Sequence, residues 1–425
     1  VRRRCGYNGS LALAESQMTA QVASDGVLGA PGSRRALAGF FISGLLFAFF
    51  GAILPSWGHH LRADYPTIGA YFLSVSAGLL ISIRVGHALL CSKGTRAGLA
   101  TGCTFAAGAL LYLAAVSPPG PAWARMIGLG FLGFACGLLH SAIFEGISPI
   151  YQHDPAATTN LGGALFGAGS LAMPLLISQT FYRSTPRTIL ILLALIPAAF
   201  AVMYARIPYG PASTALRLPV RAVLGDLRSP TAMLVGALLF FQFGNEWSVA
   251  GWLPMFLVQR LGMCPTHALL MLSVYWLVLL VGRIAVQSML PHFRSHLLMA
   301  ASIALAMFGC LILGMTDNPF GAVTGIVFTG AGFAGIYPLA MRNLENRFPN
   351  YHPAFYNGIF SVPLAGAFLA PGMLGFLAPD AGIQIVMFLP LLGSVVVALL
   401  VLAIWVEARL DRQGIRSTAS PSGLA

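Results

Sequence analysis

The chain has 425 residues, of which 57% are hydrophobic and 8% are charged, and its mean hydropathy is +0.80. A soluble domain usually has about 25% charged residues, so this composition excludes an ordinary soluble globule and indicates a polytopic helical membrane protein. The formal net charge is +12, but 23 of the 24 basic residues are Arg and no arginine-rich helix interleaved with aromatic residues is present. Nucleic acid is therefore not expected as a partner.

Twelve apolar segments follow one another, each near or above the roughly 20 residues that a helix needs to cross the hydrocarbon core. They predict an all-α membrane protein with two six-helix bundles, at 37–206 and 231–406. A cytoplasmic linker rich in Pro and Arg, 207–230, joins the bundles, and residues 1–36 (disordered) and 407–425 are predicted cytoplasmic tails. The predicted spans are 37–57, 67–90, 97–116, 123–150, 158–182, 188–206, 231–258, 267–290, 297–315, 320–341, 354–378 and 382–406.

The basic residues outside these spans are unevenly distributed between the two sides of the membrane. Seventeen fall on the side of both termini, and only five fall on the other side. Because positive residues are retained in the cytoplasm, both termini are predicted to be cytoplasmic in a multi-pass protein of the cell inner membrane. We expect a monomer in the lipid bilayer. The five residues on the outer side are Arg62, Arg125, Arg183, Arg187 and Arg260.

The two predicted bundles share an internal repeat at an offset of about 199 residues. Leu54-Pro55 then aligns with Leu253-Pro254, and Arg84 of the second span aligns with Arg283 of the eighth. Matches of Pro and Arg carry weight because both residues are uncommon inside membrane helices. Two parallel six-helix repeats are typical of the major facilitator architecture, in which the substrate lies between the halves near the bilayer midplane. Further matches join Gly133-Phe134-Ala135 to Gly332-Phe333-Ala334 and, after a two-residue deletion, Ala168-Gly169 and Pro174 to Ala365-Gly366 and Pro371.

Glu246 is the strongest site candidate among the charged residues inside the spans. A charge at a helix centre costs about 2.5–3.5 kcal/mol on insertion scales, so it needs a partner, water or a function. Gln242 and Asn245 fall on the same predicted helix face as Glu246 and could bind hydroxyl groups, while Trp252 offers a flat surface to a sugar ring. The alternative is a structural Glu that holds a neighbouring helix.

His140 and Glu145 are the corresponding titratable residues of the fourth span. They are five residues apart and point about 140° away from each other, so we expect one of the two to line the cavity. His140 is assigned to substrate or proton binding, with helix packing as the alternative. Glu145 is placed at the cytoplasmic gate or at the substrate. If transport is coupled to protons, the candidates for the titrating group are Glu246, Glu145 and His140.

Arg84 and Arg283 are repeat-related and lie about ten residues before short cytoplasmic loops. We predict that they gate the cavity, with Glu145 as one acidic partner, and anionic substrate binding is the alternative. Trp57 and Asn160 are assigned to the N-terminal half of the substrate site, and Tyr337 to the C-terminal half. Aromatic residues at these positions are weak signals on their own, because membrane interfaces also need them.

Catalytic and cofactor motifs are absent from the sequence. There is no GxxxxGK[ST] phosphate-binding loop, no zinc-ligand spacing and no nucleophile elbow. The six cysteines form neither a metal-binding pattern nor a disulfide framework. We therefore expect neither an enzyme nor a bound metal or cofactor.

Five segments carry a family resemblance: Gly51-Ala52-Ile53-Leu54-Pro55, Asn160-Leu161 with Phe166-Gly167-Ala168-Gly169, Gly244-x-Glu246 with Trp252, Gly282-Arg283, and Gly335-Ile336-Tyr337-Pro338. They resemble motifs of the fucose permease-like branch of the major facilitator superfamily, a group associated with sugar uptake by proton symport. The chain has Gly51 where proton-coupled fucose permeases carry an Asp, and His140 near the position of their fourth-span Glu.

Together the patterns and the resemblance predict a secondary active transporter that moves a small polar solute, a sugar, by alternating access with proton coupling. An exporter of drugs or metabolites on the same fold is the first alternative. A membrane sensor that does not transport is the second.

Overall fold

The computed structural model describes residues 31–61, 64–153, 155–207, 209, 230–347 and 353–418. Helices are the regular secondary structure throughout these ranges. The N-terminal half contains α2 (Pro31–Ala52), a 3-10 turn η1 (Pro55–Trp57), α3 (Tyr65–Ala115), α4 (Ala122–His153), α5 (Pro155–Thr180) and α6 (Pro186–Arg206). The C-terminal half contains α8 (Pro230–Leu261), α9 (Pro265–Met289), α10 (Ser295–Met315), α11 (Pro319–Arg347), α12 (Pro353–Ala381) and α13 (Ile385–Thr418).

These helices provide the twelve predicted crossings. Ten helices in the described ranges are long and apolar enough to span a membrane. One of them, α3, contains two crossings separated by Gly94, whose φ of 77° lies in the left-handed region that favours glycine. The twelfth crossing is α8, which is less apolar because Gln242, Asn245 and Glu246 lie in its middle.

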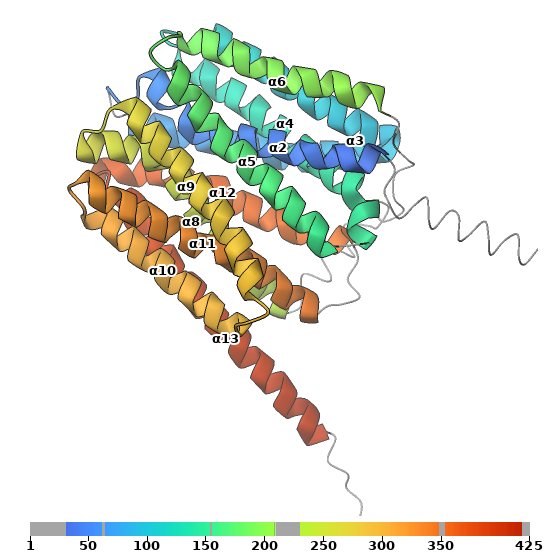
Figure 1. The fold of residues 1–425 in the computed structure, drawn as a ribbon. Coiled ribbons are helices and arrows are strands. Elements are labelled where there is room, and N and C mark those ends of the chain that lie inside the picture. Colours follow the sequence, from blue (N-terminus) through green and yellow to red (C-terminus); the bar gives the residue numbers. More distant parts are fainter. Residues whose placement is uncertain are drawn as a thin grey trace, which may run out of the picture.

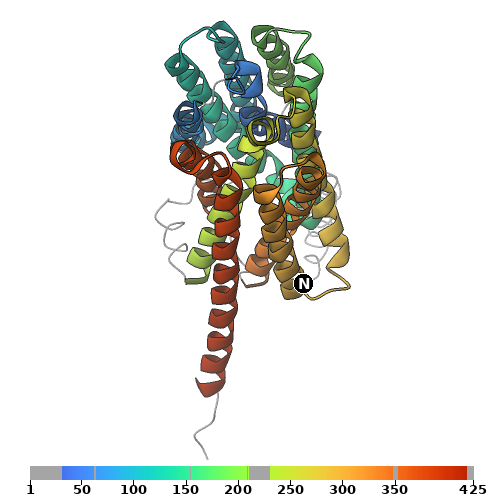
Figure 2. The ribbon, with the colours of Figure 1, turned by 90° about the vertical axis from the view of Figure 1, so that its left-hand side faces the viewer.

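Helix boundaries differ from the predicted spans mainly at the two ends of the chain. Helix α2 begins at Pro31, so residues 31–36 are helical rather than part of the tail; Pro suits the first turn of a helix because its missing N–H would have no helical partner there. Helix α13 continues beyond residue 406 to Thr418 and projects away from the bundle (Figure 2). Hydropathy marks only the apolar stretch, whereas helical hydrogen bonding continues through polar residues. The predicted disorder of residues 1–30 and most of the linker lie outside the described residues.

The two halves form two groups of helices that pack side by side, coloured blue to green and yellow to red in Figure 1. Equivalent glycines make the equivalent crossing in each half. A β-carbon on Gly169 of α5 would overlap the carbonyl oxygen of Phe41 in α2, and one on Gly366 of α12 would overlap that of Phe240 in α8. Phe41 and Phe240 are themselves 199 residues apart, so the structure repeats the backbone contact that the sequence repeat implies.

Contacts between the halves concentrate at one end of the molecule, which we name the closed end; it carries residues 53–61, 64 and 262–264. Here Gly69 of α3 packs directly against Gly375 of α12. In addition, Tyr65 donates a hydrogen bond to Gln259 (2.7 Å), and Ser178 donates to the carbonyl oxygen of Thr266 (3.2 Å). The opposite end, where α2 begins and α13 ends, is named the open end.

Candidate functional site

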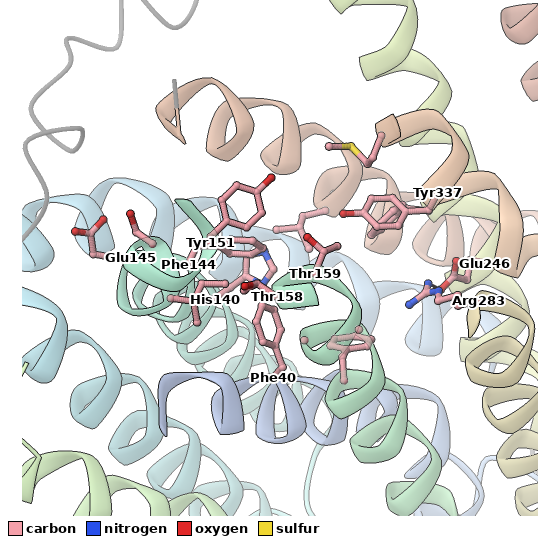
Figure 3. A pocket seen from close by; sticks show the side chains of 18 of the residues that line it. Phe40, His140, Phe144, Glu145, Tyr151, Thr158, Thr159, Glu246, Arg283 and Tyr337 are labelled. Atoms are coloured by element: carbon pink, nitrogen blue, oxygen red, sulfur yellow. Dashed lines mark hydrogen bonds and ion pairs between the residues drawn. The ribbon is translucent and has the colours of Figure 1, made fainter. Parts of the chain in front are cut away.

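A cavity of about 180 Å³ lies between the two halves, displaced toward the open end. Its walls come from α2, α4 and α5 on one side and from α8, α9, α11 and α12 on the other, so both repeats contribute (Figure 3). The lining residues are Phe40, His140, Phe144, Glu145, Ile147, Ser148, Tyr151, Thr158, Thr159, Gly162, Gly163, Phe166, Phe243, Glu246, Trp247, Arg283, Tyr337, Met341 and Leu364.

The C-terminal wall of the cavity contains a buried ion pair. Arg283 of α9 donates from Nη2 to Oε1 of Glu246 in α8 at 3.0 Å, and the two side chains are 17% and 2% exposed. The Arg283 guanidinium also lies 6.0 Å from the ring centroid of Tyr337. A charged pair in a low-dielectric interior interacts far more strongly than one at the surface, so each residue supplies the partner that the other needs within the spans.

This ion pair keeps hydrogen-bonding capacity for a ligand. Oε2 of Glu246 and Nε of Arg283 have no hydrogen-bond partner among the described residues. An unused acceptor therefore lies beside an unused donor. Since a hydroxyl group both donates and accepts, neighbouring hydroxyls of a polyol match this arrangement.

The N-terminal wall presents neutral polar groups among aromatic rings. His140 lies against Phe144, with ring centroids 4.7 Å apart, and neither ring nitrogen of His140 has a hydrogen-bond partner in the described part of the chain. The buried hydroxyl of Thr158 also lacks a partner there. Buried polar atoms are nearly always satisfied by protein, water or ligand, so these atoms are candidates to contact a solute.

An aromatic floor separates the two polar walls. Phe166 of α5 and Trp247 of α8 have ring centroids 6.4 Å apart, and Trp247 also packs on Phe47 of α2 at 5.4 Å. In Figure 3, Glu246 and Arg283 lie on one side of the view, and His140 and Thr158 on the other. A solute that reaches both walls would cross this apolar floor.

Gln242 and Asn245, expected on one face with Glu246, and Trp252, expected to stack on a sugar ring, contact neighbouring helices instead. Gln242 donates to the carbonyl oxygen of Phe333 in α11 (3.4 Å), and Asn245 packs against Gly393 of α13. Trp252 donates to the carbonyl oxygen of Pro371 in α12 (2.9 Å). None of the three lines this cavity. Helix α8 is surrounded by other helices, so residues that differ by roughly 40° to 120° around its axis meet different neighbours.

Trp57 and Asn160 also lie away from the cavity. Helix α2 ends at Ala52, so Trp57 lies in the 3-10 turn at the closed end, where the Arg125 guanidinium is 5.6 Å from its ring centroid. Asn160 is exposed on α5 and is not among the residues that line the cavity. Their assignment to the substrate site has no support in this geometry.

Both His140 and Glu145 line the cavity, although we expected only one of them to do so. The two side chains leave α4 in different directions, and the cavity extends to both (Figure 3). The structure has no ion pair between Arg84 and Glu145, both of which lie in its described ranges; Arg84 is exposed on α3. Arg283 pairs inside the cavity rather than at the helix end.

Sequence reasoning missed the residues of the aromatic floor and the hydroxyls beside it. Phe166 and Trp247 were visible in quoted motifs, but nothing in their spacing distinguishes a cavity wall from a helix contact. The Thr158-Thr159 pair at the start of α5 was a usable signal, because two adjacent hydroxyls at a predicted helix start place at least one toward the bundle.

The sequence profile of the Major Facilitator Superfamily matches residues 36–362. The chain belongs to this superfamily and is a membrane transporter rather than an enzyme. An uncharacterised MFS-type transporter of Yersinia pestis is 20% identical over 359 residues, which cover 81% of this chain and 88% of the relative.

Solved transporter structures have the same fold. The nucleoside transporter NupG, solved as a point mutant, is 15% identical with a TM-score of 0.67, covering 88% of this chain and 99% of its own. A D-xylose-proton symporter is 15% identical with a TM-score of 0.67, covering 86% and 96%. The Escherichia coli fucose:proton symporter FucP is 17% identical with a TM-score of 0.60, covering 88% and 98%. At these identities the likeness is one of fold, in agreement with the all-α architecture predicted from the sequence.

Proposed function

We propose that this protein is a secondary active transporter that moves a small polar solute, a sugar, by alternating access coupled to protons. The observation that carries the proposal is the buried Glu246–Arg283 pair in the wall of a cavity between the two halves, with an unused acceptor beside an unused donor. Two of the structural neighbours are named as symporters of a sugar and a proton, which supports the same class of solute.

The distribution of basic residues supports an orientation with both termini in the cytoplasm of the cell inner membrane. The open end then faces the cytoplasm, and the structure corresponds to an inward-facing state. Closing of this end and separation of the closed end would expose the same cavity to the outside.

Glu246 is the group we propose to carry the proton. In its ionised form it holds Arg283, and protonation removes the charge attraction between them. Solute hydroxyls would then compete for Arg283, so that the proton and the solute occupy the site together. His140 and Glu145 remain secondary candidates, because both also line the cavity.

Uptake into proteoliposomes tests this proposal. Purified protein is reconstituted and uptake of radiolabelled hexoses, pentoses and polyols is measured with and without an inward proton gradient. The proposal predicts that Glu246→Gln abolishes accumulation of the transported sugar while retaining exchange across the membrane. Asp317→Asn is the matched control, since it neutralises a carboxylate that pairs with Arg260 at the closed end. Undiminished accumulation by Glu246→Gln would remove this residue from the coupling role.

The aromatic floor favours a second candidate, an exporter of less polar metabolites or drugs. An apolar surface contributes binding free energy in proportion to the apolar area that it covers. Uptake of an aromatic solute into inside-out vesicles, with no response to sugars, would support the exporter over the sugar importer.

A further inference from the structure

Arg84 is a charged residue with exposed apolar neighbours on the outer surface of α3. It lies in the first crossing of α3, and its neighbours Leu80, Ile81 and Val85 are exposed by 48%, 61% and 44%. The described residues provide Arg84 with no hydrogen bond and no ion pair. An exposed apolar surface of this kind on a membrane-spanning helix faces lipid, so the guanidinium lies where a counter-charge is needed.

The N-terminal half supplies no carboxylate at the position where the C-terminal half does. Glu246 corresponds to Phe47 at the repeat offset of 199, and the Phe47 ring is packed between Trp247 and Phe368, with centroids at 5.4 and 5.5 Å. Asp64 lies at the closed end and caps α3 through Thr67. No carboxylate of the described residues forms an ion pair with Arg84, which leaves its guanidinium available to an external anion.

Arg84 belongs to a stripe of exposed polar residues that follows one face of α3 to the open end. Leu73 marks this face, because it contacts Gly372 of α12: a β-carbon on Gly372 would lie 2.7 Å from its Cδ2. Arg84 is eleven residues further along and about 20° from the direction of Leu73. His87 and Cys91 continue the stripe, with Nε2 and Sγ 3.7 Å apart. We name Arg84, His87 and Cys91 the α3 stripe.

The α3 stripe connects the middle of the helix with its polar end. Arg84 lies ten residues before Gly94, about 15 Å along the helix axis. At that end Lys93 and Arg96 are exposed and add positive charge. A phosphate group could follow these residues inward from the membrane surface, meeting a donor at each turn.

We propose that the α3 stripe binds the headgroup of an anionic phospholipid, with its phosphate on Arg84. The planar guanidinium donates two parallel hydrogen bonds to phosphate oxygens, which a lysine ammonium cannot reproduce. The acyl chains lie along Leu80, Ile81 and Val85. An anionic lipid is favoured over a zwitterionic one because its headgroup has no cation to be repelled by the positive residues of this segment.

Native mass spectrometry of the full-length, delipidated protein tests the proposal. The protein is titrated separately with phosphatidylglycerol and with phosphatidylcholine of the same acyl chains. We expect one phosphatidylglycerol to bind about tenfold more tightly than phosphatidylcholine. Both lipids offer a phosphate to Arg84, but phosphatidylcholine also brings a choline cation that Arg84, Lys93 and Arg96 repel. Arg84→Leu should abolish this preference, and Arg84→Lys should retain part of it.

The controls separate a specific site from general attraction to positive charge. Arg187→Leu removes an exposed arginine at the start of α6, at the closed end, and should keep the preference. Soluble glycerophosphate in excess should not displace the lipid. If Arg84→Leu does not yield folded protein, Arg84→Gln is measured in its place. Retention of the preference in the folded variant, equal binding of both lipids by the unaltered protein, or displacement by glycerophosphate would each overturn the proposal.

Discussion

The two halves of the molecule repeat the same helix crossings, but their repeat-related arginines lie in opposite environments. In the C-terminal half Arg283 is mostly buried and paired with Glu246, while in the N-terminal half Arg84 is exposed and Phe47 occupies the position of the carboxylate. The glycines at the crossings are constrained by backbone contact on both sides of the repeat. The comparison teaches that packing preserves the repeat, whereas the charged positions have diverged with their roles.

Removal of the Glu246 carboxylate should have the largest effect on stability, because it leaves the Arg283 guanidinium largely buried without its ion-pair partner. Glu246→Leu is expected to lower the free energy of unfolding by about 3–5 kcal/mol. The double variant Glu246→Leu/Arg283→Leu should recover most of this loss, since it replaces the ion pair with apolar groups. Thermal unfolding in detergent measures both. A double variant as unstable as the single one would contradict a stranded charge as the cause.

The repeated crossings should be equally sensitive in the two halves. Gly169→Ala and Gly366→Ala each place a β-carbon against a backbone carbonyl, and each should cost about 3 kcal/mol, the upper range for overpacking. Gly108→Ala and Gly236→Ala are matched controls, because a β-carbon there has open space; they should stabilise by about 0.4–1 kcal/mol. Unequal losses of unfolding free energy at Gly169 and Gly366 would show that the two crossings are not equivalently packed.

Acid sensitivity should reside in the closed end of the N-terminal half. His59 is buried there, and burial, with a smaller contribution from Arg125, lowers its pKa to about 4. Its repeat counterpart is Val258, which cannot titrate. Between pH 6.5 and pH 4, His59 is protonated in the unfolded state but stays neutral in the folded state. The free energy of unfolding therefore decreases as the pH is lowered through this range. The loss should be about 2 kcal/mol at about pH 5.

Unfolding measured from about pH 7.5 to about pH 5 checks the role of His59. His59→Gln should flatten the pH dependence, while His60→Gln, next to it in the same segment, should change it much less, because His60 is the smallest contribution to the His59 pKa. A steep dependence that persists in His59→Gln would assign the acid sensitivity to another group.

Arg84→Leu should have the smallest effect among the arginine and glycine variants. Since the described chain gives Arg84 no partner, its removal should change the free energy of unfolding in lipid-free detergent by less than about 0.5 kcal/mol. Arg283→Leu is the comparison variant, because it leaves Glu246 buried without its partner. Equal losses at the two arginines would show that the halves do not differ in the way proposed.

The spans, the two halves and the repeat could be predicted because each is marked by residues that are close together or regularly spaced in the sequence. A helix that crosses lipid must satisfy its own backbone, so about twenty apolar residues are sufficient evidence for it. Gly169 and Gly366 could be matched for the same reason, since each occupies a fixed position in a repeated unit. The start of α2 at Pro31 was missed because an amphipathic or polar turn leaves no hydropathy signal.

The part of the candidate site that could be predicted was found mainly through its titratable residues. Glu246, His140, Glu145 and Tyr337, which were assigned to the substrate or proton site, line the cavity, and so does Arg283, which was assigned to gating. Gln242, Asn245 and Trp252 do not, because a helix with neighbours on all sides gives every polar residue a different environment. Periodicity assigns a residue to a face but does not say which neighbour that face meets.

The sequence by itself determined the class of protein, because low charge and twelve apolar spans follow from the physics of crossing a bilayer, and the internal repeat can be read from matched Pro, Arg and Gly residues. The tertiary structure decided the pairing of Arg283 with Glu246, the exposure of Arg84 and the position of the cavity. These features depend on which helices become neighbours after packing. Helix packing depends on contacts between residues that are far apart in the chain. Those contacts could not be predicted from the pattern of a single sequence.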